Sequence, residues 1–478
     1  MKKAKKVFLK ILAAILAIIF AVCAVCGIYY AASRSCTLTV KVDTKSPLRD
    51  FYGWGTSDCW WADNIDDEET RNQIADVLFT DKGLNLDTYR YCLYGGYDPD
   101  NTVVTSQWRL GESFYYYNEQ SGSYEYDWSK SENARLMLQA ALDRGVDTVV
   151  LFANSPHYSM CINGRSSGAD DGESSNISPE KYQDYVDYFL TITQHFIDEG
   201  VPVKFISPIN EPQWGWGGES PAQEGCHYEK EQAVKLLKLF AKGIKERNMD
   251  VKLCALESGN IGDTAKGYYE AMAADEDISS VLGVHSFHSY FNDTNALKKS
   301  KFGKWIDKNV SVRSDMSEWC ELPSAHDASD PATACIMARV ISNDISKLNV
   351  NAWCNWVAVN EIGVGDDGKD YSDGLLVADP NNTADYYTAY RLYGYMQFSK
   401  FVPAGSQVLD CGDGMLTLTS SKTDEGTTYR ELVNETAFKT PDGKIVVVVV
   451  NEGNSRNVKF SLDDYSNVSA VSYTHLRA

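Results

Sequence analysis

The feature that most constrains the fold is a regular alternation of strand-like and helix-like segments over residues 51–357. Short strand-like runs are predicted at residues 84–91, 148–154, 203–209, 252–257, 281–288, 312–317 and 352–357, and the segment near Phe51 is counted as a further strand. Apolar residues at helical spacing predict helices at residues 69–79, 132–144, 179–199, 230–247 and 332–347. Eight strands, each led to the next by a crossover, predict an α/β protein built as a (β/α)₈ TIM barrel.

A different pattern begins after residues 403–406, where short strands alternate with turn signals such as Asp442-Gly443. We therefore expect the barrel to occupy residues 49–400 and an appended C-terminal β-sandwich to occupy residues 401–478. Apolar and polar side chains alternate at residues 36–42, so residues 36–48 are expected to contribute a strand to the β-domain. The final stretch, 472–478, fits this pattern poorly. We expect an incomplete sandwich, with a natural short tail as the other reading.

Residues 1–35 are typical of a segment directed to a membrane. Five lysines precede or open an almost uninterrupted apolar run at residues 11–30, which is long for a signal-peptide core and sufficient to span a bilayer. The best cleavage motif, Ala31-Ala32-Ser33, is weak. We expect an exported, extracellular protein whose residues 1–35 are either a signal peptide or an N-terminal transmembrane anchor at the cell surface, with the lysines inside.

Charge and composition exclude several classes of function. A formal net charge of −21 repels phosphate backbones, so nucleic acid is not an expected partner. The 29 Tyr and 11 Trp serve core packing first, although flat aromatic faces also suit sugar binding. The cysteines from Cys36 onward form no Cys-x-x-Cys pair. That spacing argues against a zinc site and leaves free thiols, or one or two disulfides, as alternatives.

Two glutamates follow the fourth and seventh predicted strands. The fourth ends in Asn210-Glu211-Pro212, and Glu318 comes directly after residues 312–317. Because the carboxyl ends of parallel barrel strands meet at one edge, both side chains are expected to project into one cleft. One carboxyl group can protonate a glycosidic oxygen while the other attacks the anomeric carbon, giving a covalent intermediate that water resolves. Either glutamate alone is more often a surface or ion-pair residue, so the prediction depends on the pair.

The residues around this pair resemble the retaining glycosidases built on this barrel and, more narrowly, glycoside hydrolase family 30. The matching stretches are residues 53–61, 89–91, 95–96, 154–156, 163–164, 207–212, 223–226, 288–290, 317–318 and 353–356. The run 207–226, with Trp214 and Trp216, is most similar to the endo-β-1,6-galactanase branch. The family also carries a β-domain, so the resemblance covers nearly all of the chain after its first 35 residues. The resemblance identifies the family more specifically than it identifies the substrate.

The resemblance implies a role for each matching residue. Glu211 would be the acid/base and Glu318 the nucleophile. Asn210 would hydrogen-bond the 2-hydroxyl of the sugar in the cleavage subsite, an interaction that strengthens in the transition state. Asp58 would hold hydroxyls on the far side of that sugar, and Trp356 would form its floor.

Further substrate-site residues follow from the same resemblance. His288 and Tyr290 would orient the nucleophile, and Arg90 would hydrogen-bond carboxylates at the base of the cleft. The remaining expected substrate-binding residues are Trp60, Asn154 and Trp214.

Other readings of the polar residues stay open. Arg90 is alternatively a buried structural ion-pair partner, and Gln223 and Glu224 either shape a subsite or cap a turn. His285 and His288 have no carboxylate or cysteine at ligand spacing around them, so neither a metal nor another cofactor is expected.

The sequence thus predicts a retaining glycoside hydrolase that cleaves β-linked galactan side chains in the manner of an endo-β-1,6-galactanase. It would act as a monomer by a two-glutamate double displacement. One alternative is a same-family enzyme on β-1,6-glucan, xylan, glucosylceramide or a β-fucoside, with endo or exo action undecided. Another is a catalytically inactive surface glycan-binding protein, which the presence of both carboxylates and Asn210 argues against.

Overall fold

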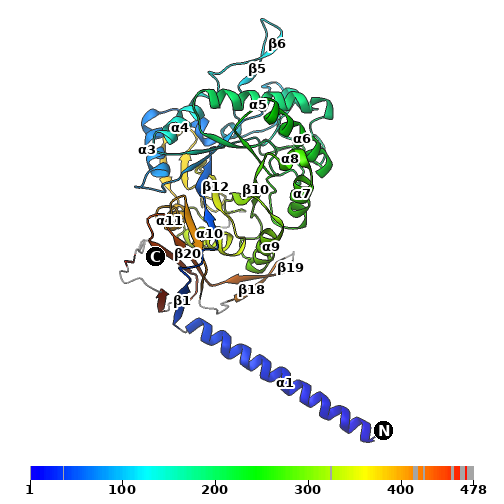
Figure 1. Ribbon diagram of the computed structural model, residues 1–478, viewed down its shortest axis with the longest axis vertical. Coiled ribbons are helices and arrows are strands. Elements are labelled where there is room, and N and C mark those ends of the chain that lie inside the picture. The colour runs from blue at the N-terminus through cyan, green and yellow to red at the C-terminus, as the bar shows by residue number, and fades with distance from the viewer. Residues whose placement is uncertain are drawn as a thin grey trace.

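The computed structural model describes residues 2–35, 37–322, 326–412, 418–423, 426–453, 457–462 and 469–470. Eight parallel strands close into a barrel, and helices surround it (Figure 1). The order around the barrel is β10-β11-β12-β3-β4-β7-β8-β9. The strands are β3 (Gly53–Ser57), β4 (Thr88–Cys92), β7 (Thr148–Phe152), β8 (Val203–Ser207), β9 (Lys252–Cys254), β10 (Leu282–His288), β11 (Arg313–Glu318) and β12 (Ala352–Val357). The predicted TIM barrel is confirmed.

The helices around the barrel are amphipathic and bury one face against the strands. In α5, for example, Val186, Phe189 and Phe196 are buried. The N-terminus of α3 is capped by Asp67, whose carboxylate accepts a hydrogen bond from the Thr70 backbone N–H. The helices are α2 (Trp61–Asn64), α3 (Glu68–Phe79), α4 (Glu132–Leu142), α5 (Tyr182–Asp198), α6 (Lys230–Glu246), α7 (Asp263–Ala273), α8 (Glu276–Ser279), α9 (Ala296–Asn309), α10 (Ala332–Lys347) and α11 (Tyr390–Ser399).

Several strand boundaries differ from the prediction. β4 begins at Thr88 rather than at residue 84, because the chain turns at Asn85, whose φ is 55°. β7, β8 and β9 end two to three residues before the predicted ends, at Phe152, Ser207 and Cys254. The polar residues that follow these three strands therefore lie in loops at the carboxyl end of the barrel. Their backbone is not held in the extended conformation of a strand.

Some elements carry no clear sequence pattern and were not predicted. Helices α7, α9 and α11 belong to this group. So do the hairpin of β5 (Tyr115–Asn118) with β6 (Ser123–Tyr126) and the sheet of β13 (Val359–Glu361), β14 (Leu376–Asp379) and β15 (Asn382–Thr388). Short pairs of this kind are stabilised mainly by their tertiary surroundings, so their own sequences indicate them weakly.

The segments that flank the barrel form small sheets. One four-stranded sheet joins β2 (Arg49–Phe51), β16 (Ser406–Leu409), β20 (Val433–Lys439) and β21 (Ile445–Asn451). β1 (Leu38–Val42) pairs with β17 (Cys411–Gly412) and β22 (Val458–Leu462), and β18 (Leu418–Thr423) pairs with β19 (Gly426–Glu431). The division at residues 36–48, 49–400 and 401–478 remains our proposal, supported by the pairing of β1. Cys36 and residues 472–478 lie outside the described residues.

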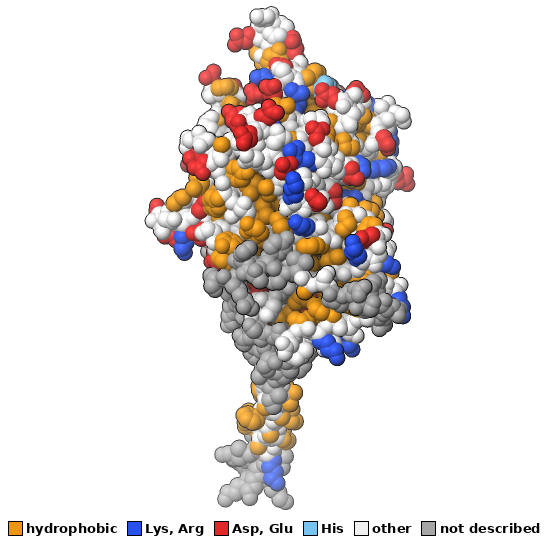
Figure 2. Space-filling view, turned by 90° about the vertical axis from the view of Figure 1, so that its left-hand side faces the viewer, with side chains coloured by type: hydrophobic (Ala, Val, Ile, Leu, Met, Phe, Trp, Pro, Cys, Tyr) orange, Lys and Arg blue, Asp and Glu red, His pale blue; other side chains and the backbone are white. Residues whose placement is uncertain are grey.

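The N-terminal helix α1 (Lys2–Ser35) extends away from the barrel (Figure 1). Its segment Lys10–Gly27 has a mean hydropathy of 2.6 and is not buried by the rest of the chain. In the part of the chain that the structure describes, it is the one helix long and apolar enough to cross a membrane. Figure 2 shows its hydrophobic side chains beneath a body that carries many Asp and Glu side chains.

Candidate active site

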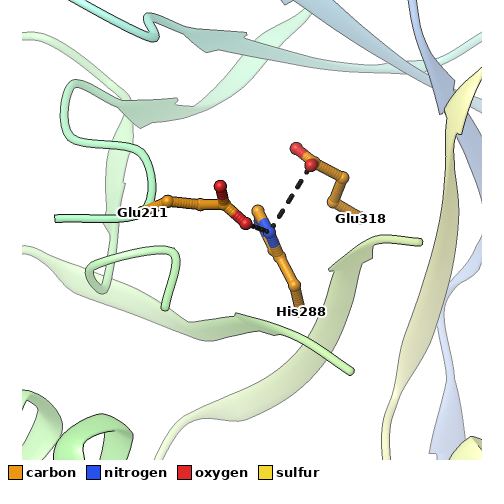
Figure 3. A group of neighbouring side chains, drawn as sticks. All are labelled: Glu211, His288 and Glu318. Atoms are coloured by element: carbon orange, nitrogen blue, oxygen red, sulfur yellow. Dashed lines mark hydrogen bonds and ion pairs between the residues drawn. The ribbon is translucent and has the colours of Figure 1, made fainter. Parts of the chain in front are cut away.

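Glu211 and Glu318 meet at the carboxyl end of the barrel, together with His288. One carboxylate oxygen from each glutamate and one ring nitrogen of His288 all lie within 4.8 Å of one another. The three side chains converge from different loops and strands on the same space (Figure 3). Both glutamates are almost buried, at 8% and 4% exposed. Two carboxyl groups this close match the separation of about 5–5.5 Å in retaining glycosidases rather than the 6.5–9.5 Å of inverting ones.

The backbone of Glu211 has an uncommon conformation. Its φ is 44°, in the left-handed region that side chains other than glycine seldom adopt. The Glu211 N–H donates to the Glu257 carbonyl at 2.8 Å, and the Glu211 carbonyl accepts from Trp214 N–H at 3.2 Å. These bonds hold a strained residue in place, as is common at active sites.

Gly259 leaves room beside the Glu211 carboxyl group. A Cβ at Gly259 would lie 2.2 Å from Trp214 Nε1 and 2.5 Å from Glu211 Oε1. The indole of Trp214 thus lies next to the Glu211 carboxyl group, and it meets the Phe291 ring edge-on at 6.0 Å between centroids. The structure places the predicted Trp214 at the site.

Glu318 is held by two hydrogen-bond donors. Arg90 Nη1 donates to its Oε2 at 2.7 Å, and the Tyr290 hydroxyl donates to its Oε1 at 3.1 Å. Burial raises the pKa of Glu318, and the positive charges of His288 and Arg90 oppose that rise. Arg90 and Tyr290 are therefore placed as the sequence predicted, against the expected nucleophile.

His288 bridges the two glutamates instead of serving Glu318 alone. Its Nδ1 lies 2.8 Å from Glu211 Oε1 and 3.5 Å from Glu318 Oε1. Its Nε2 lies 3.2 Å from Glu257 Oε2. Burial disfavours a charge on this ring, but the surrounding carboxylates outweigh burial and raise the pKa of His288 to about 9. At neutral pH the ring is an imidazolium that donates from both nitrogens.

Glu257 is a third glutamate at this end of the barrel, and the sequence reading gave it no role. Its side chain is fully buried, and its Oε2 accepts from Arg90 Nη2 at 2.8 Å and from His288 Nε2. Burial alone would raise its pKa, but the Arg90 and His288 charges lower the pKa of Glu257 to about 2. The signal that could have found it is its position just after the fifth strand, equivalent to that of Glu211 after the fourth.

Asn210 is fixed on both sides of its amide group. Its Nδ2 donates to Asn154 Oδ1 at 3.0 Å, and its Oδ1 accepts from Arg90 Nη2 at 3.1 Å. Asn154 and Asn210 are both buried, so these bonds fix the orientation of the amide next to Glu211. The structure brings together Asn154, Asn210 and Arg90, three residues that the sequence predicted separately.

Asp58, Trp60 and Trp356 lie on the β3 and β12 side of the barrel. Asp58 is fully buried; its Oδ1 accepts from the Cys92 N–H at 2.7 Å, while its Oδ2 has no hydrogen-bond partner among the described residues. Burial raises the pKa of Asp58 well above its usual range. The ring of Trp60 meets that of Trp356 edge-on at 5.5 Å. Both rings are nearly buried, and the Arg109 guanidinium covers the Trp60 ring at 4.8 Å.

The ligand atoms of Glu211, His288 and Glu318 are close enough to surround a metal ion. The chemistry of the donors does not fit one. A ligating histidine must offer a neutral ring nitrogen, whereas His288 lies among three carboxylates that favour its imidazolium form. Arg90 also occupies an oxygen of Glu318. His285 is a separate core residue, hydrogen-bonded to Ser314 and packed on Tyr269.

None of the described cysteines forms a disulfide. Cys59, Cys92 and Cys161 are buried, and burial raises the pKa of their thiols. The sequence left open free thiols or one or two disulfides, and these three residues are free thiols.

A TIM barrel with paired carboxylates at the carboxyl end of strands four and seven defines a glycoside hydrolase. Residues 37–377 match the O-glycosyl hydrolase family 30 profile, and residues 419–475 match the glycosyl hydrolase family 30 β-sandwich domain. The chain therefore belongs to O-glycosyl hydrolase family 30.

Relatives agree with this assignment. The chain is 24% identical over 448 residues to an endo-β-1,6-galactanase of Hypocrea rufa, covering 89% of this chain and 83% of the relative. The fold is shared with a conserved exported protein from Bacteroides fragilis (TM-score 0.73, 21% identity, 89% of this chain and 92% of that one). It is also shared with the catalytic domain of xylanase C from Talaromyces cellulolyticus (TM-score 0.61, 18% identity, 86% of each chain).

Proposed function

We propose that this family 30 enzyme hydrolyses β-1,6-linked galactan side chains with retention of anomeric configuration. The observation that carries the mechanism is the approach of a Glu211 oxygen and a Glu318 oxygen to within 4.8 Å. At that spacing no water fits between an inverting base and the sugar, so Glu318 itself attacks. The galactan part of the proposal is supported by the similarity to the Hypocrea rufa galactanase.

In the first step Glu211 acts as the acid. His288 donates to Glu211 Oε1 and leaves Oε2 to carry the proton. That proton passes to the glycosidic oxygen, while a Glu318 oxygen forms a bond to the anomeric carbon and the leaving sugar departs as an alcohol. Arg90 and Tyr290 orient Glu318 for this attack, and the charges of Arg90 and His288 stabilise its ionised form.

In the second step the roles reverse. Water attacks the anomeric carbon, Glu211 takes the water proton, and the bond to Glu318 breaks to restore its carboxylate. Asn210 is our candidate for the group that holds the sugar 2-hydroxyl, since Asn154 and Arg90 fix its amide. Asp58, Trp60, Trp214 and Trp356 complete the proposed sugar site.

A panel of glycans tests this proposal. The purified enzyme is incubated with β-1,6-galactan, β-1,6-glucan, xylan, glucosylceramide and an aryl β-fucoside, and product sizes are read by chromatography. Cleavage of the galactan is expected, with product sizes separating endo from exo action. Activity on another glycan alone would overturn the substrate assignment, and an inverted anomer in the proton NMR spectrum would overturn the double displacement.

We also propose that the enzyme acts outside the cell as a monomer, with α1 serving as a signal peptide or a membrane anchor. The exposed, apolar segment Lys10–Gly27 supports this reading. Fractionation of producing cells separates the two forms: a retained anchor places the full-length chain with the membranes, and a cleaved signal places a shorter chain in the medium. Recovery of the full-length chain in the cytosol would overturn export.

A further inference from the structure

A small pocket beside Trp60 is not used by the two-glutamate chemistry. Loops that follow β4, β7 and β8 surround it, and all three leave the catalytic end of the barrel. We call it the Glu224 pocket, and the residues that matter here are Gly96, Asn101, Arg109, Gly111, Ser166 and Glu224. It has room for about one water-sized group.

Glu224 is the buried polar group of this pocket. It is 5% exposed, and its Oε2 has no hydrogen-bond partner among the described residues. Burial raises the pKa of Glu224 to about 8, against the opposing hydrogen bonds of Gly95, Ser166 and Gly96. A neutral carboxyl group both donates and accepts a hydrogen bond, as a sugar hydroxyl does. Leaving the Oε2 atom buried without a partner costs free energy that a bound hydroxyl would recover.

The loop that carries Glu224 is tied to the catalytic residue Glu211. Trp216 Nε1 donates to the Glu211 carbonyl at 3.2 Å. The Trp216 ring packs on Gly225, where a Cβ would lie 2.3 Å from it, and the Gly225 N–H donates to the Ser166 carbonyl at 3.0 Å. These contacts link the position of Glu224 to that of the acid/base.

The pocket lies on the Trp60 side of the site, because Arg109 lines it and stacks on the Trp60 ring. Glu211, which would protonate the leaving oxygen, has Trp214 and Gly259 as neighbours. On the Trp60 side, Cys59 Sγ accepts from Asn154 Nδ2 at 3.6 Å, and Asn154 in turn holds the Asn210 amide. Arg109 connects the pocket to Trp60 and has no ion pair or side-chain hydrogen bond within the described parts of the chain.

We propose that the Glu224 pocket binds a single hydroxyl group of the sugar unit that precedes the cleaved one, with Glu224 and Arg109 as its polar contacts. This inference rests on the proposed hydrolysis of a β-linked galactan. It makes Glu224 a specificity residue for oligosaccharides, since a substrate with one sugar unit does not reach the pocket.

The test compares two substrates on each variant. We measure kcat/KM for a β-1,6-galactotriose and for an aryl β-galactoside. The quantity compared between variants is the galactotriose value divided by the aryl galactoside value. Glu224→Leu is expected to lower the ratio about 10-fold to 100-fold, the effect of one unmade hydrogen bond in a buried site. Glu224→Gln, which keeps a donor and an acceptor, should restore most of it. Glu219→Gln, an exposed acid of the same loop, is the matched control and should leave the ratio unchanged.

Arg109→Met keeps a long side chain over the Trp60 ring and removes only the guanidinium hydrogen-bond donors. It therefore tests the pocket even if Glu224→Leu does not fold. It is expected to lower the ratio as well. An unchanged ratio in a folded Glu224→Leu or Arg109→Met variant overturns the inference. If the wild-type enzyme cleaves another glycan instead of galactan, the proposed substrate is wrong, and the same ratio measured on oligosaccharides of that glycan still decides on the pocket.

Discussion

Arg90 Nη2 lies 2.8 Å from Glu257 Oε2, and both side chains are only 1% exposed. The same guanidinium reaches Glu318 through Nη1, so one buried cation joins a structural carboxylate to the expected nucleophile. Glu257 also holds His288, which contacts Glu211. A buried charge that loses its partner is strongly destabilising, so this network depends on all of its members.

Replacing the acid/base should separate two classes of substrate. Glu211→Gln is expected to lower kcat about 10²-fold to 10⁴-fold for galactan, because the leaving sugar needs a proton. An aryl glycoside with an acidic phenol leaves without that proton, so its first step should be nearly normal and a burst of phenol should appear. Glu318→Gln should hydrolyse neither substrate. Normal turnover by Glu318→Gln would refute the assignment of the nucleophile.

Removing Glu257 should change the pH profile. Glu257→Gln takes away one of the carboxylates that raise the pKa of His288 to about 9, so that pKa falls. The alkaline limb of kcat against pH should move to lower pH, and kcat should fall about 10-fold to 100-fold as Arg90 and His288 shift. Glu270→Gln, a helix-surface change in α7, provides the control. A lower kcat with an unmoved alkaline limb would mean that Glu257 acts only in packing.

The stability of the enzyme should fall as pH rises above neutrality. The pKa of His288 is about 9 in the folded chain and about 6.5 in a model peptide, so the folded state binds this proton more tightly. The resulting stabilisation, about 3 kcal/mol, is complete below pH 6.5 and is lost as pH rises to 9. Urea unfolding at pH 6, 7, 8 and 9 measures it. His288→Gln should remove this part of the slope, whereas His195→Gln on α5 should retain it.

The amide of Asn210 should matter only when the substrate has a 2-hydroxyl. Asn210→Ala is expected to lower kcat on the normal aryl galactoside about 10²-fold to 10³-fold, since the contact strengthens in the transition state. On the 2-deoxy analogue the wild type and the variant should be about equally slow. A full Asn210→Ala effect on the 2-deoxy substrate would show that the residue works through Arg90 or Asn154 instead.

A methyl group at position 259 should displace the acid/base. In Gly259→Ala the new Cβ would lie 2.5 Å from Glu211 Oε1 and 2.2 Å from Trp214 Nε1, so both groups must move. A shift of about 1 Å in a catalytic group costs about 10²-fold in rate. Gly267→Ala in α7 is the control, because a Cβ there meets no atom within 4 Å and alanine favours the helix. Full activity in Gly259→Ala would show that Glu211 tolerates displacement.

The sequence was sufficient for the barrel, because strand-like and helix-like patterns are local and recur in order along residues 51–357. It also placed Glu211 and Glu318 on one edge, since parallel barrel strands must all end there. It assigned no role to Glu257, although that residue was included in a predicted strand, because periodicity does not say which side chains meet across a barrel. It linked His288 to Glu318, whereas the closer contact is with Glu211.

The amino-acid sequence by itself thus determined the order of the elements, the edge that holds the chemistry, and the two residues expected to perform it. Only the closed barrel decided their protonation and spacing. Arg90 lies within the second strand, His288 ends the sixth and Glu257 follows the fifth. Their contacts exist because closure of the barrel brings these strands within hydrogen-bond distance of one another. Burial then removes water from the group, so each charge is set by its neighbours rather than by solvent.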